Sequence, residues 1–171
     1  MSKTKDPFFK RAIHEAGHGL LCHYLGVIPE ELTCHEEKEG GFGLYKKPLD
    51  DFGFENATLE IEEKAKSLAM VYIAGREAVL KIQTEAIACA DFEFDYRKAK
   101  ECLTSLALSE DEKIILIQNL EKEVREVFRD EDRWRGVEKL AEELLKNKAL
   151  SWKEVKSILQ QMLLRPRFRI S

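Results

Sequence analysis

The segment His14-Glu15-Ala16-Gly17-His18 constrains this chain more than any other stretch of its sequence. Residues four positions apart lie on one face of an α-helix, so His14 and His18 can hold one metal ion between their imidazoles. Glu15 follows the first histidine and can reach a water molecule on the same ion. Two histidine ligands and a glutamate that accepts a proton from the water are typical of zinc peptidases. The segment therefore predicts a Zn²⁺ site with His14 and His18 as metal ligands and Glu15 as the catalytic base.

The residues around this segment favour a metal site over two ordinary surface histidines. The predicted helix runs from about Asp6-Pro7, a capping carboxylate followed by a proline, to about Leu25. Its apolar residues indicate that the helix is largely buried. Two histidines and a glutamate on a buried helix need partners, because an unpaired buried charge is costly. A metal ion is such a partner.

Length, charge and cysteine content limit the class of protein. The chain has 171 residues, which suits one domain, and we expect a metal-site core over residues 1–106 and a helical subdomain over 107–171. The net charge of −4 gives no reason to expect nucleic acid or an anionic membrane as partner. No apolar run is long enough to span a bilayer and no secretory signal is evident. The four cysteines lack a Cys-x-x-Cys pair and are expected to be reduced thiols of a cytoplasmic protein.

A glycine-bearing stretch follows the first helix. Residues 27–47 are expected to form two short strands joined by a turn near Gly40-Gly41. A strand beside a metal site often pairs with an extended peptide, because its free backbone groups can hydrogen-bond to another chain. The candidate substrate-binding residues on this strand are Gly41, Phe42, Gly43 and Leu44. Cys34-His35, at the end of the first strand, is a less favoured second metal pair, because sequence neighbours rarely share a metal.

The rest of the chain has helical periodicity. A second helix is expected over residues 57–81, and its small residues Ala74, Gly75 and Ala78 suggest close packing on the metal helix. Arg76 and Glu77 between them are either surface charges or supports of the site. Ser109 with Glu112, and Ser151 with Glu154, have the form of capping boxes that begin two helices of the C-terminal third. The fold class expected is mainly α, with a small β-hairpin or sheet beside the site and a C-terminal helical bundle.

A third metal ligand is expected from the helix that opens near Asp95. The apolar residues after Asp95 are spaced so that they lie on one face of a helix. They are Tyr96, Ala99, Cys102, Leu103 and Leu106. This pattern places Asp95 at the helix start on the buried side, where a carboxylate needs a partner. Asp91 and Glu93 are rival ligands, and an ordinary helix cap is the alternative role for Asp95.

These pieces, in this order, resemble the peptidase domain of the FtsH-type zinc metalloproteases. The similarity rests on the segment from His14 to Leu20, the strand Gly41–Tyr45, the helical segment Ala74–Ala78 and the helix start at Asp95; the C-terminal helices match more weakly. The resemblance implies a mainly helical peptidase fold, one zinc ion held by His14, His18 and a distal aspartate, and endopeptidase activity with Glu15 as base.

The chain departs from the family in two ways. The segment before the expected aspartate is Ile87-Ala88-Cys89-Ala90, which aligns Asp91 in register, whereas the helix face favours Asp95. The 171 residues also contain no Gly-x-x-x-x-Gly-Lys-Ser/Thr loop of the family's ATPase module. We therefore expect cleavage of flexible peptides or unfolded proteins, with a separate ATPase or unfoldase partner needed for folded substrates. The family works as rings, which favours a homo-oligomer.

Two other classes of function remain open. One is a catalytically inactive metal-binding or interaction module with a peptidase-like fold; the presence of Glu15 argues against it, since such a site has no use for a base. The other is a structural helical protein in which the histidine motif is coincidental. That protein would bind less than one equivalent of metal and would not be destabilised by a chelator.

Overall fold

The computed structural model describes residues 7–34, 41–42, 53–83 and 90–162, without the side chains of residues 41, 42, 90 and 91. Helices dominate this part of the chain, which confirms the expected mainly α fold. The elements, in chain order, are α1 (Pro7–Leu25), β1 (Glu31–Thr33), β2 (Gly41–Phe42), α2 (Ile61–Ile82), α3 (Ala90–Cys102), the 3₁₀ turn η3 (Leu103–Ser105), α4 (Glu110–Arg129), α5 (Glu131–Asn147), β3 (Ala149–Ser151) and α6 (Trp152–Gln161). None of the helices in the described ranges is long and apolar enough to cross a membrane.

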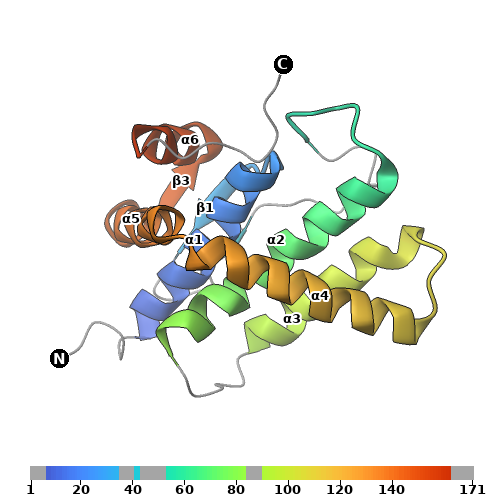
Figure 1. Ribbon diagram of the computed structural model, residues 1–171. Coiled ribbons are helices and arrows are strands. Elements are labelled where there is room, and N and C mark those ends of the chain that lie inside the picture. The colour runs from blue at the N-terminus through green and yellow to red at the C-terminus, as the bar shows by residue number, and fades with distance from the viewer. Residues whose placement is uncertain (1–6, 35–40, 43–52, 84–89, 163–171) are drawn as a thin grey trace.

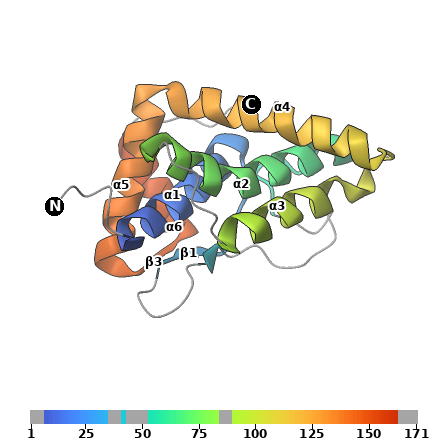
Figure 2. The same ribbon diagram turned by 90° about the horizontal axis from the view of Figure 1, so that it is seen from below.

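Helix α2 is at the centre of the arrangement. It lies between α1 on one side and α3 and α4 on the other, and α5 covers the far side of α1 (Figure 1). Seen from below, α4 runs across α2 along one edge of the molecule, while β1 and β3 lie at the opposite edge (Figure 2). Apolar side chains from all six helices form one continuous core. Burial of α1 and α2 on several sides explains why both are apolar over most of their circumference.

The sheet contains the two expected short strands and a third that was not expected. It has three strands in the order β2-β1-β3, with both pairings antiparallel. Strand β3 comes from the C-terminal third, which we expected to be entirely helical; Leu150 on it pairs with Leu32 on β1, and both are buried. Three residues are too few to show an alternating pattern, so the sequence gives no sign of this strand. As a result the C-terminal segment is tied to the sheet beside α1.

Local signals at the helix ends agree with the sequence. Ser109 and Ser151 each accept a hydrogen bond from the backbone N–H three residues on, and the glutamate there accepts one in return, so both capping boxes are confirmed. The left-handed backbone of Gly26, with φ +71°, follows α1 at the expected stop. Helix α2 begins at Ile61, four residues later than expected.

Candidate metal centre

Helix α1 presents the histidine motif to the interior of the protein. His14, Glu15 and His18 are 7%, 4% and 1% exposed, so the motif is not a solvated helix face. Asp95 reaches the same place from α3 and is 7% exposed. Three of the four candidate residues thus come from one helix, and the fourth from a helix on the other side of α2. Four buried titratable groups in one place require compensation.

Three ligand atoms converge at this point. The Nε2 atoms of His14 and His18 are 3.1 Å apart, and Asp95 Oδ2 lies 3.0 Å from the first and 3.3 Å from the second. Among the described residues these three form the one group of His, Cys, Asp or Glu side chains with suitable metal-ligand spacing. A tetrahedral zinc ion with bonds of about 2.0–2.1 Å to nitrogen and oxygen keeps neighbouring ligand atoms roughly 3.3 Å apart. The observed triangle is close to one face of that tetrahedron.

The protonation of His18 is set by the protein backbone. Its Nδ1 lies 2.7 Å from the carbonyl oxygen of Val71 on α2. A carbonyl can only accept, so Nδ1 carries the hydrogen and the neutral ring presents a lone pair at Nε2. This is the usual outer support of a metal-bound histidine. Asp95 Oδ2, in turn, is buried without a hydrogen bond of normal geometry, so one more electron-rich atom faces the same point. Such a cluster repels itself unless a cation or protons occupy it, and it could therefore hold a metal ion.

When no metal is bound, protons can balance the charges of the cluster, as the pKa values of His18 and Asp95 show. Burial lowers the pKa of His18, but the charge of Asp95 and close contact with it, helped by the charge of Glu15, raise it more, to about 9. Burial likewise raises the pKa of Asp95, but the charge of His18 and contacts with both histidines outweigh this and lower it to about 2. In the metal-free protein an imidazolium–carboxylate pair thus holds the centre together.

Asp95 does not lie at the start of its helix, where we expected it. Helix α3 begins at Ala90, so Asp95 lies more than one turn inside it and is not a cap. Glu93, one of its rivals, is exposed and outside the cluster. Asp91 lies on α3, but its side chain is not among those described. Tyr96, which we expected on the buried face, is 37% exposed.

A ring from α3 also supports His14. Phe92 stacks on the imidazole of His14 at a centroid distance of 5.7 Å and an interplanar angle of 22°. The sequence analysis did not predict this contact, because Phe92 precedes the apolar stripe identified on its helix. The contact restricts the orientation of a ring that could otherwise turn about its χ angles.

The predicted substrate strand lies beside α1. Gly41 and Phe42 form β2, at one end of the sheet order; Gly43 and Leu44 lie outside the described residues. The sheet approaches α1 closely at Gly19, where a Cβ would be 2.4 Å from Leu32 Cδ1 on β1. A side chain at this position would require the Leu32 side chain to shift.

Other groups singled out in the sequence lie elsewhere. Glu77 is buried, with Arg76 Nη1 at 3.5 Å and Arg125 Nε at 3.6 Å, so the Arg76–Glu77 pair links α2 to α4 rather than supporting the metal centre. Cys34 is buried, and His35, the other residue of the less favoured second metal pair, lies outside the described residues. A third histidine of α1, His23, lies outside the cluster and is buried near Trp152, with 6.5 Å between the ring centroids.

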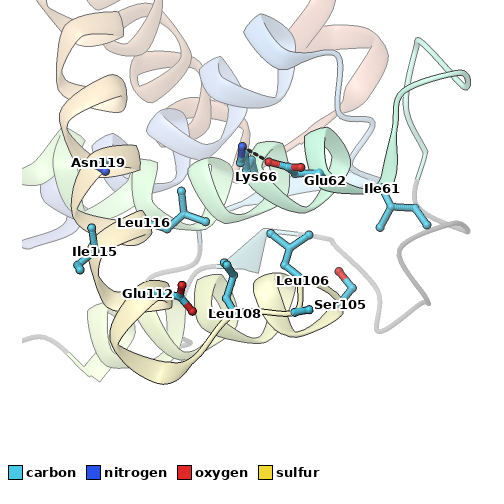
Figure 3. A pocket seen from close by; sticks show the side chains of 11 residues that line it. Ile61, Glu62, Lys66, Ser105, Leu106, Leu108, Glu112, Ile115, Leu116 and Asn119 are labelled. Atoms are coloured by element: carbon cyan, nitrogen blue, oxygen red, sulfur yellow. Dashed lines mark hydrogen bonds and ion pairs between the residues drawn. The ribbon is translucent and has the colours of Figure 1, made fainter.

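A separate hollow of about 630 Å³ opens between the start of α2, η3 and the start of α4 (Figure 3). Its walls are mostly apolar, with Leu106, Leu108 and Leu116 facing inward, and the Lys66–Glu62 ion pair lies at its rim. None of the four candidate residues lines it. The hollow is therefore not part of the metal centre.

No protein-family model matches the chain, and no curated protein matches its sequence.

Proposed function

We propose that this protein is a zinc-dependent metalloendopeptidase that hydrolyses peptide bonds in flexible or unfolded polypeptides. The observation that carries the proposal is the buried triangle of His14 Nε2, His18 Nε2 and Asp95 Oδ2, with Glu15 next to the first ligand in the chain. The resemblance of the same segments to FtsH-type peptidase domains supports it. A metal-binding module without catalysis would need the three ligands but not the buried glutamate.

The protein's own residues have distinct parts in this proposal. His14, His18 and Asp95 hold the ion, and the Val71 carbonyl keeps His18 in the tautomer that can bind. A zinc ion bound there would supply a Lewis acid that makes water acidic near neutral pH and polarises the scissile carbonyl. Glu15 accepts the proton of the attacking water on its carboxylate and returns it to the leaving amine. Burial of all four side chains limits the access of bulk water, which strengthens these electrostatic effects.

The peptide would bind in extended form on β2. This strand ends the sheet order and pairs with β1, which lies against α1 beside the motif. Strand addition supplies backbone hydrogen bonds without regard to side chains, which suits a peptidase acting on unfolded segments. Folded substrates would need a separate unfoldase.

The test combines metal content with cleavage of a reduced, carboxymethylated protein that cannot fold. Wild type is expected to bind one zinc per chain and to cleave. Glu15→Gln is expected to keep zinc and lose cleavage, whereas Glu93→Gln, an exposed acid on α3, keeps both. Zinc binding by wild type without cleavage would identify an inactive metal-binding module. No binding of zinc would overturn the proposal.

A further inference from the structure

Two glycines lie where α1 and α2 cross, and their surroundings differ. A Cβ on Gly17 would be 2.8 Å from the backbone oxygen of Ala74 and 2.8 Å from the Cβ of Ala78. The three atoms nearest to a Cβ on Gly75 would all belong to imidazoles: His14 Cε1 at 2.6 Å, His18 Nε2 at 2.6 Å and His18 Cε1 at 2.7 Å. Gly17 therefore permits the close approach of two helices, whereas Gly75 leaves room for two candidate ligands.

We infer that Gly75 is a positioning residue of the metal centre: its missing side chain allows both imidazoles to lie against α2 with their Nε2 atoms converging. The inference rests on the proposed metal site and concerns a residue outside the ligand set. The backbone of α2 lies against the two imidazoles and restricts their positions, while α1 and α3 supply the ligands.

The size of the clash explains why a methyl group is too much. Ordinary contact of a Cβ begins near 3.4 Å, so the 2.6 Å approaches require the rings to move by about 0.8 Å. Metal–ligand bonds are satisfied only within about 0.2 Å of their ideal lengths. His18 cannot avoid the clash by turning, because its Nδ1 is held by Val71 at the other end of the ring. His14 is confined by the stacked ring of Phe92.

The same geometry predicts little harm to the metal-free fold. The atoms in the way are the far ends of side chains rather than backbone, so the two rings can shift while the packing of α1 on α2 is kept. Alanine is also more favourable than glycine inside a helix. Gly75→Ala should therefore separate metal binding from folding, and Gly17→Ala is the matched control, because its clash is with backbone.

The experiment measures zinc affinity by competition with a chromogenic chelator and the melting temperature of the metal-free protein, for wild type and both variants. Gly75→Ala is expected to melt within a few degrees of wild type or above it and to bind zinc at least tenfold more weakly, the loss typical of disturbed support around a metal ligand. Gly17→Ala is expected to lower the metal-free melting temperature. Cobalt(II) in place of zinc should give Gly75→Ala an altered visible spectrum.

The outcomes separate this inference from the proposed function. Zinc affinity of Gly75→Ala within threefold of wild type would overturn the inference and leave the peptidase proposal intact. A metal-free melting temperature as low as that of Gly17→Ala would also overturn it, because the role would then be structural. Selective loss of zinc in Gly75→Ala, combined with a zinc-loaded wild type that cleaves nothing, would sustain the inference and overturn the peptidase. A wild type that binds no zinc would overturn both.

Discussion

His18 on α1 donates a hydrogen bond from Nδ1 to the carbonyl oxygen of Val71 on α2, at 2.7 Å. Gly75 lies four residues, or about one helical turn, further along α2. A Cβ at Gly75 would clash with the other end of the same ring. One imidazole thus spans one turn of α2, with its Nδ1 occupied and its Nε2 turned toward His14 and Asp95. The α1–α2 interface fixes both the orientation and the tautomer of the ring.

The metal-free protein should lose stability as the pH rises above neutral. The pKa of His18 is about 9 in the folded protein, above its ordinary 6.5, so its protonation favours folding. That contribution is fully present below pH 6.5 and is lost as the pH rises through about 9. Urea midpoints measured in chelator at pH 6, 7.5 and 9 should fall in that order. Asp95→Asn, which removes the charge that raises the pKa, should show a smaller fall; an equal fall would contradict this origin.

Low pH should also weaken the His18–Asp95 pair of the metal-free protein. The pKa of Asp95 is lowered from 3.8 to about 2, so its contribution is present above pH 3.8 and is lost as the pH falls through about 2. The metal-free centre is thus most stabilising between about pH 4 and 6.5.

Zinc affinity should rise between pH 6 and 9, whereas the stability of the metal-free protein falls, because a ligand must lose its proton before it binds metal. Competition titrations across this range test it, and affinity independent of pH would exclude His18 as a ligand.

The third ligand can be identified by substitution on α3. Asp95→Ala should reduce zinc affinity roughly tenfold or more, because Oδ2 completes the triangle with both histidines. Asp91→Ala and Glu93→Ala, on the same helix, should keep one zinc per chain. Metal analysis after dialysis against a weak chelator distinguishes the three variants. Retention of zinc by Asp95→Ala together with its loss in Asp91→Ala would reverse the assignment.

Removing the charge of Arg125 should destabilise the protein without affecting the metal centre. Burial raises the pKa of Glu77, and Arg125 and Arg76 oppose this, so Arg125→Met leaves a buried carboxylate less well compensated. We expect a loss of about 1–2 kcal/mol at pH 7, which diminishes as the pH falls and Glu77 takes up a proton.

Chemical denaturation with an exposed control checks this prediction. Arg129→Met removes a surface ion pair with Glu126 and should cost less than about 0.5 kcal/mol. Zinc affinity should be unchanged in both variants. A loss of zinc in Arg125→Met would connect the α2–α4 ion pairs to the centre after all.

Local rules predicted the helices of this fold well. The spacing of His14 and His18, the capping serines at 109 and 151 and the glycine at 26 are all decided within a few residues of sequence, and the structure agrees at each. Strand β3 was missed because its pairing with β1 joins residues more than a hundred positions apart. The position of Asp95 within its helix was wrong because the helix starts at Ala90, earlier than the apolar stripe suggested.

Sequence patterns alone were enough to predict a mainly helical protein with two histidines one turn apart on a buried helix. They also named Asp95 as a partner, with Asp91 and Glu93 as rivals. The packing of the helices was needed to show that Asp95 is the described acid that meets the histidines, that Val71 orients His18, and that Gly75 makes room for both rings. These contacts could not be predicted because helix periodicity and capping act over three or four residues, whereas the centre depends on how three helices pack, which no local pattern encodes.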